Sequence, residues 1–168
     1  MNKLNERLFF VMVFILQLVI SDYLHLGPWI SLSLIPFFIV SISLQRSPQA
    51  VMLIAFGLGI GLDILSDGVV GLNAFAAVMA AAPRKFFYRL LVNSDRQDKT
   101  EILTPRDAGF AKYLRYLGII TAIYMAAYVL LDCVSFRPAG FMLLKFAAST
   151  VASTALCLLP AFSLQHRN

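Results

Sequence analysis

The chain has 168 residues, of which 60% are hydrophobic and 14% charged, and its formal net charge at pH 7 is +5. A soluble domain is usually about half apolar and about a quarter charged, and a single core of this size cannot bury the excess. The composition excludes an ordinary soluble domain and indicates one integral membrane domain over residues 1–168, in which lipid solvates much of the apolar surface.

Charged residues divide the chain into six apolar segments, which predict an all-α bundle of six transmembrane helices. The expected spans cover residues 8–21, 28–45, 47–62, 70–87, 113–131 and 140–164, with a cytoplasmic loop at 88–112. Several are shorter than the about 20 residues that cross the hydrocarbon core. Flanking charged side chains that reach the headgroups, or local thinning of the bilayer, would supply the missing length, unless one segment is re-entrant.

The first two segments carry signals for their ends. Lys3 and Arg7 precede the first segment, but no small-x-small cleavage site follows it, so we expect an uncleaved anchor. The pair Gly27-Pro28 predicts the start of the second helix, where the missing proline N–H costs nothing. Pro36 predicts a kink midway along that helix.

One long hydrophilic stretch separates the fourth and fifth segments. It begins with PRKFFYRLLV, which is typical of a helix end at headgroup depth, and continues through the polar linker NSDRQDKTE. The sequence TPRD then predicts that the fifth helix begins near Pro105, with Thr104 as its N-cap and Asp107 in a capping box. We expect this helix to enter the membrane near Tyr116.

The basic residues predict the orientation. Six spans place both termini on the same side as the loops at 45–47 and 84–115. That side then holds twelve Lys and Arg residues, namely Lys3, Arg7, Arg46, Arg84, Lys85, Arg89, Arg96, Lys99, Arg106, Lys112, Arg115 and Arg167, and the other side holds only Arg137 and Lys145. By the positive-inside rule, both termini are cytoplasmic.

The densest basic cluster has two interpretations. The cluster comprises Arg84, Lys85, Arg89, Lys112 and Arg115. It either attracts anionic lipid and sets the topology, or forms a docking patch for a cytoplasmic protein. No nucleic-acid-binding motif accompanies the charge, so we expect no nucleic-acid partner.

The stretch FGLGIGLDILSDGVVGLNAF, residues 56–75, concentrates glycines and acids. Gly57 and Gly61 form a G-x-x-x-G pair on one helical face, and the neighbouring face carries the small residues Ala55 and Gly59. These small residues predict close packing in the bundle or against a partner. Asp63 follows near the outer interface. It either ends the helix in water, or turns inward and accepts N–H hydrogen bonds from the start of the next helix.

The loop after Asp63 contains further candidate residues. Asp67 and Gly68 predict a turn, and Asn73 is expected to cap the first turn of the next helix. Asp63 and Asp67 would share a helical face, but two carboxylates make an incomplete shell for a divalent cation. We therefore predict no metal site and no cofactor.

Other side chains give little support for catalysis. Hydrolase, zincin and nucleotide-binding motifs are missing from the sequence, so we expect no enzyme. Ser149 and Ser153 lie four residues apart, each followed by a threonine, and predict a small-residue packing face. Cys133 and Cys157 fall in opposite halves of the expected membrane domain, so no disulfide between them is predicted.

The segment GLGIGLDILSDGVVGLNAFAAVMAAAPRKFFYRLL resembles the rod shape-determining MreD family, in its Bacteroidetes-like version. The residues that carry the resemblance are Gly57, Gly61, Asp63, Ser66, Gly68, Gly71 and Ala74. HLGPWISLSLIPFF, TPRDAGFAKYLRY and SFRPAGFMLLK extend the similarity over most of the chain.

The resemblance implies a non-enzymatic scaffold of the cell-elongation complex in the bacterial inner membrane. Such a subunit binds the periplasmic protein MreC and helps couple MreB filaments to the transglycosylase RodA and its transpeptidase partner, in peptidoglycan synthesis. The implied fold is similar to the membrane substrate-binding subunit of energy-coupling-factor transporters. The alternative is a vitamin-type small-molecule-binding subunit, with Asp63, Asp67, Trp29 or Tyr128 at an outward-facing pocket.

Overall fold

The structure is a computed structural model that describes residues 3–23, 30–66, 69–92, 103, 105–132 and 139–167. Trp29, Asp67, Gly68, Thr104 and Cys133 lie outside the described residues, so the predictions that name them stay untested. Helices account for all the regular structure in the described ranges: α1 (Lys3–Tyr23), α2 (Ile35–Ser41), α3 (Pro48–Leu65), α4 (Leu72–Ala81), α5 (Arg84–Leu91), α6 (Pro105–Ala108), α7 (Phe110–Asp132) and α8 (Ala139–Arg167).

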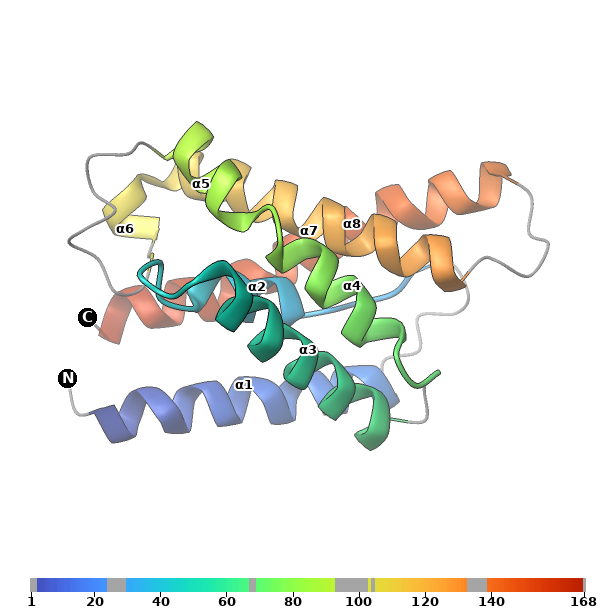
Figure 1. The fold of residues 1–168 in the computed structure, drawn as a ribbon, viewed down its shortest axis with the longest axis horizontal. Coiled ribbons are helices and arrows are strands. Elements are labelled where there is room, and N and C mark those ends of the chain that lie inside the picture. Colours follow the sequence, from blue (N-terminus) through green and yellow to red (C-terminus); the bar gives the residue numbers. More distant parts are fainter. Residues whose placement is uncertain are drawn as a thin grey trace.

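The chain runs back and forth along the long axis of the molecule. Figure 1 shows α1 leading away from the N-terminal end, α3 and α4 running in opposite directions, and α7 and α8 running out and back. The two termini lie at the same end, together with α5, α6 and the connection between α2 and α3. The opposite end, called the outer end here, contains the ends of α3 and α7 and the beginnings of α4 and α8.

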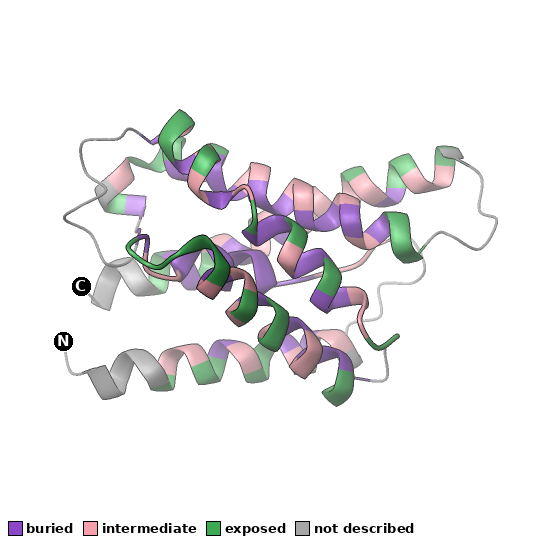
Figure 2. Cartoon of the chain, viewed as in Figure 1, coloured by how far each residue is buried: buried purple, intermediate pink, exposed green. Residues whose placement is uncertain are grey.

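The short helix α2 lies in the middle of the bundle, and all seven of its residues are buried. Helices α3, α4, α7 and α8 pack around it. Figure 2 shows the buried residues gathered on the faces that these helices turn toward one another. Helix α1 packs on this core through the buried residues Val13 and Ile20 and through aromatic rings. The ring centroids of Phe10 and Phe14 lie 6.0 and 6.3 Å from that of Phe38.

The outward faces of the helices are strongly apolar. Three helices in the described ranges are long and apolar enough to cross a membrane, at Pro48–Leu65, Phe110–Asp132 and Gly140–Ser163, and shorter apolar helices cover Leu8–Ser21 and Leu72–Ala81. Large hydrophobic side chains on these faces are open to the surroundings; Leu53 and Val151, for example, are each 72% exposed. An all-helical chain with such surfaces indicates an integral membrane protein.

The predicted second helix, 28–45, is wrong in its extent. Residues 30–34 have no helical structure, and α2 begins only at Ile35, with Pro36 in its first turn. Pro36 therefore starts a helix and does not kink one. In a longer helix its ring would clash with the carbonyl one turn earlier, whereas in the first turn its missing N–H costs nothing.

Two other predicted helices are divided. The expected span 70–87 consists of α4 and α5, separated by a turn at Ala82 and Pro83, and α5 continues to Leu91 into the predicted loop. The helix expected to start at Pro105 is interrupted at Gly109, whose φ of 82° is left-handed, and α7 begins after it. Only a residue without a Cβ adopts this backbone conformation without strain.

Candidate functional site

Helix α3 delivers Asp63 to the outer end of the bundle. It starts at a capped terminus, where the Ser47 hydroxyl accepts the Ala50 N–H at 3.3 Å and Pro48 occupies the first turn. It ends at Ser66, whose N–H and hydroxyl both donate to the Leu62 carbonyl, at 2.9 and 2.8 Å. The carboxyl group of Asp63 therefore lies in the last turn, beside the connection to α4.

The Asp63 carboxylate turns inward and is only 2% exposed. Its Oδ1 accepts the Asn73 N–H at 3.1 Å and the Asn73 Nδ2 at 2.8 Å. Its Oδ2 accepts the N–H groups of Gly71 and Ala74, at 2.9 and 3.2 Å. The prediction that Asp63 organises the next helix start is confirmed, and the alternative that it reaches water is wrong. Negative charge at this position also complements the dipole of α4.

Gly59 allows α3 and α4 to approach closely enough for this arrangement. A Cβ atom on Gly59 would lie 2.4 Å from the Ala74 Cα and 2.7 Å from the Asn73 carbonyl oxygen. Gly57, in contrast, has nothing within 4 Å of its Cβ position, and Gly61 has only the Phe14 ring at 3.8 Å. The close contact within the chain therefore depends on Gly59, while packing of Gly57 and Gly61 against a partner stays a prediction.

Asn73 does not cap its own helix, contrary to the prediction. The residue before α4 is Gly71, with a left-handed φ of 97° and no side-chain cap. Asn73 lies inside the first turn, where its amide donates to Asp63 and its Oδ1 accepts the hydroxyl of Tyr124 on α7. Asp63 provides the cap from the preceding helix, and Asn73 links it to α7. We call Gly59, Asp63, Gly71, Asn73 and Tyr124 the carboxylate clamp.

The clamp occupies the hydrogen-bonding capacity of Asp63. A carboxylate offers about four lone-pair sites, and four donors of this chain fill those of Asp63. The described residues contain no group of three His, Cys, Asp or Glu side chains placed to hold a metal. The arrangement thus holds the start of α4 beside the end of α3, and ligand binding through Asp63 would require the clamp to open.

A second polar arrangement supports the non-helical segment, residues 30–34. The Ser149 hydroxyl accepts the Ser31 N–H at 2.9 Å. The Ser153 hydroxyl accepts the Ser33 N–H at 3.1 Å and donates to the Ser31 carbonyl at 3.4 Å. On the next turn of α8, the Cys157 thiol contacts the Ser33 carbonyl at 3.5 Å.

Gln17 completes this support from α1. Its side-chain oxygen accepts the Leu34 N–H at 2.5 Å, and Gln17 is 1% exposed. Non-helical backbone is tolerated at membrane depth only where protein or a water-filled cavity satisfies its polar groups. Ser149, Ser153 and Cys157 provide this satisfaction, so the predicted small-residue face of α8 has a specific hydrogen-bonding role.

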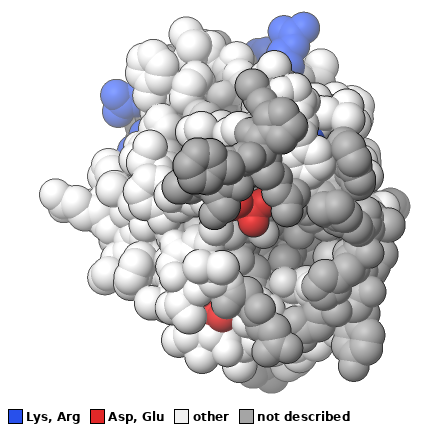
Figure 3. All heavy atoms as spheres, turned by 90° about the vertical axis from the view of Figure 1, so that its right-hand side faces the viewer, with Lys and Arg blue, Asp and Glu red and all other residues white. Residues whose placement is uncertain are grey.

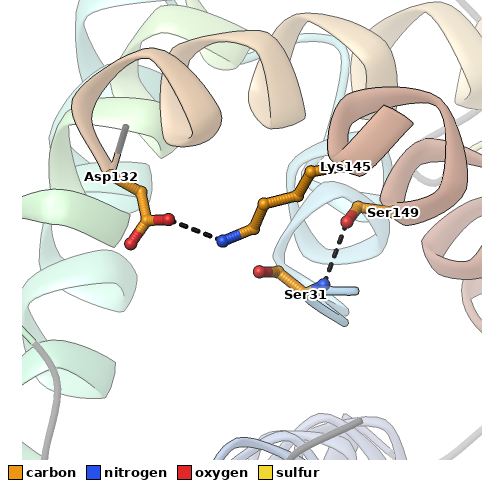
Figure 4. Close-up of polar contacts among 4 residues, drawn as sticks. All are labelled: Ser31, Asp132, Lys145 and Ser149. Atoms are coloured by element: carbon orange, nitrogen blue, oxygen red, sulfur yellow. Dashed lines mark hydrogen bonds and ion pairs between the residues drawn. The ribbon is translucent and has the colours of Figure 1, made fainter. Parts of the chain in front are cut away.

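Lys145 continues the same face of α8 toward the outer end. Figure 4 shows its side chain reaching across to Asp132 at the end of α7, with the Ser31–Ser149 hydrogen bond on the neighbouring turn. The Lys145 ammonium lies 2.5 Å from the Asp132 carboxylate, and the two side chains are 7% and 33% exposed. This pair joins α7 to α8. The described surface of the outer end is otherwise mostly uncharged (Figure 3).

The predicted basic cluster is divided by the structure. Arg89, Lys112 and Arg115 are exposed and Lys85 is partly exposed, but Arg84 is only 1% exposed. The Arg84 guanidinium donates to the Ile42 carbonyl after α2 and lies beside Tyr116 of α7. The prediction that Arg84 belongs to a surface patch is therefore wrong, because the packing of α5 on α7 covers this residue.

The sequence did not identify Gln17, Tyr124 or the contact of Gly59 with Ala74. The last two carry no local signal, because their partners lie on other helices. A polar residue inside an apolar run, such as Gln17, was the available clue, since an intramembrane polar group usually has a partner.

The fold and the buried polar groups define an all-helical membrane protein whose irregular backbone is stabilised from within. No protein-family model, curated protein or solved structure matches the chain. Its class therefore rests on its composition, its apolar helices and the two polar arrangements described above.

Proposed function

We propose that the protein is a non-enzymatic scaffold subunit of a bacterial inner membrane, similar to the MreD family. It binds an MreC-type periplasmic protein and helps couple MreB filaments to peptidoglycan synthesis by RodA and its transpeptidase partner, which regulates cell shape. The observation that carries the proposal is the carboxylate clamp. Three of the residues on which the resemblance depends meet there, because the N–H groups of Gly71 and Ala74 both donate to the carboxylate of Asp63.

The course of the chain supports a six-span topology with both termini in the cytoplasm. Successive elements alternate in direction, and the two termini lie at one end (Figure 1). The second crossing consists of residues 30–34 and α2, and the fourth of α4 and α5. Exposed Arg46, Arg89 and Arg115 belong to the side with twelve basic residues, which the positive-inside rule assigns to the cytoplasm.

The clamp also supports a contact surface at the outer end. It anchors both sides of the turn between α3 and α4, where Val69 and Val70 are 71% and 68% exposed. Val69 and Val70 directly precede the anchored Gly71, so they lose less conformational entropy on binding a partner than a free segment would, and their apolar side chains gain by burial. We assign Val69 and Val70 to the contact with the MreC-type protein.

Co-purification tests this function. The tagged chain is co-expressed with the MreC-type protein of the same genome and purified in mild detergent, and the wild-type pair is expected to elute as one complex. The double variant Val69→Ala, Val70→Ala is expected to lower the yield of complex at least about five-fold, because about 1 kcal/mol of apolar contact is removed.

The matched control is Leu53→Ala, which removes an equally exposed apolar side chain from the middle of α3. It is expected to leave the yield unchanged. Absence of a wild-type complex would refute the proposed partner, and equal yields for the double variant and the wild type would refute the assigned surface. Genomic proximity to an MreC-type gene is the independent check.

A further inference from the structure

A cavity opens between α1, α2 and α3 near the end of the molecule that contains the termini. Its volume is about 320 Å³, and its apolar walls include Phe10, Phe38, Ile54 and Leu58. Two of its lining rings, those of Phe10 and Phe38, are in contact, with their centroids 6.0 Å apart. The connection between α2 and α3 forms its rim.

The rim of this cavity is polar and positive. Ser41 lines it with only 4% of its surface exposed, and its hydroxyl oxygen is buried behind the wall. Arg46 lines it from the connection and is exposed. Its side chain forms no ion pair with the acidic groups that the structure describes.

A second cation lies behind the cavity wall. Ile42 lines the cavity, and its carbonyl accepts a hydrogen bond from the buried guanidinium of Arg84. The only ion pair within the described ranges joins Lys145 to Asp132, so Arg84 has no carboxylate partner there. Its Nε also has no hydrogen-bond partner among those residues. A buried positive charge without a counterion favours an anion nearby.

We propose that this cavity binds one anionic phospholipid, with the phosphate beside Arg46 and the upper acyl chain against Phe10, Ile54 and Leu58. Charge complementarity favours an anionic headgroup, because its phosphodiester supplies a negative charge for Arg46 that no choline ammonium offsets. The apolar walls favour a lipid over a small anion, because only a lipid has acyl chains to bury against them. Basic cavities between membrane helices near the cytoplasmic face bind anionic headgroups in this way.

The inference requires that the chain lies in a membrane and is independent of any MreC-type partner. A lipid in this position would join α1 to the α2–α3 connection, next to the ring contact between Phe10 and Phe38. It would therefore stabilise the attachment of the first helix.

Native mass spectrometry of the full chain tests the proposal. The protein is delipidated in detergent and titrated with phosphatidylglycerol or with phosphatidylcholine of the same acyl chains. One phosphatidylglycerol is expected to bind at least about five-fold more tightly than phosphatidylcholine, the ratio expected from one basic residue near a headgroup. Arg46→Gln is expected to remove this preference, and Arg89→Gln, an exposed cation on α5 outside the cavity, to preserve it.

Two further measurements complete the test. Leu58→Trp fills the cavity and is expected to weaken binding of both lipids while the helical circular dichroism stays unchanged. Inorganic phosphate is expected to give no thermal stabilisation. Equal affinities for the two lipids, equal effects of Arg46→Gln and Arg89→Gln, or stabilisation by inorganic phosphate equal to that by lipid would each overturn the proposal.

Discussion

The substitution Asp63→Asn probes the carboxylate clamp with almost no change in shape. Each carboxylate oxygen accepts two hydrogen bonds from α4 and the residues before it. An asparagine in either amide orientation retains one oxygen and presents its NH₂ group to the other two donors. Two buried donors therefore lose their acceptor, at about 1–3 kcal/mol each, so we expect a loss of stability of about 3 kcal/mol.

Thermal unfolding in detergent, followed by circular dichroism, measures this loss. At about 2–4 °C per kcal/mol for a chain of this size, Asp63→Asn is expected to lower the melting temperature by about 6–12 °C. Asp63→Ala leaves all four donors without their acceptor and is expected to lower it further. Gln49→Ala, an exposed position on the same helix, is the control and is expected to have no effect. A melting temperature for Asp63→Asn within about 2 °C of the wild type would refute the clamp.

Two further predictions concern packing and the non-helical segment. Gly59→Ala is expected to lower the melting temperature in the same assay, because the new Cβ would lie 2.4 Å from the Ala74 Cα. Gly57→Ala has open space around the new Cβ and is expected to be neutral or slightly stabilising. Equal effects at the two glycines would contradict the close approach of α3 and α4. Ser153→Ala removes the hydroxyl that accepts the Ser33 N–H and donates to the Ser31 carbonyl, and it is expected to lower the free energy of unfolding by about 2 kcal/mol. The control is Ser163→Ala, which is expected to be neutral because this hydroxyl donates to Leu159 in its own helix. An unchanged melting temperature for Ser153→Ala would show that α8 does not support this segment.

Local sequence signals predicted the parts of the fold that depend on neighbouring residues. Long apolar runs predicted the helical regions that contain α1, α3, α7 and α8, because twenty or so apolar residues with few charges have few other stable conformations in lipid. Asp63 follows the glycine-rich run and could either reach water or turn inward. Its neighbours in sequence could not decide between these two roles. The structure decided, because the donors that surround Asp63 come from residues 71–74 once the chain has reversed direction.

Pro36 illustrates the limit of local reasoning. A proline in an apolar run is compatible with a kinked helix, and the sequence favoured that interpretation. The structure instead begins α2 there, and residues 30–34 stay non-helical. Its backbone groups are satisfied by Gln17 from the first helix and by Ser149 and Ser153, which come more than one hundred residues later. The energy of such a segment depends on partners that no local pattern identifies.

The sequence by itself determined that the chain is apolar, helical and suited to a bilayer, since composition and charge spacing fix which solvent each segment prefers. Tertiary structure alone decided which polar groups meet: Asp63 with the start of α4, Lys145 with Asp132, and Arg84 with the carbonyl of Ile42. The reason is that a polar group in an apolar interior is stable only with a partner, and helix packing, which depends on the whole chain at once, selects that partner.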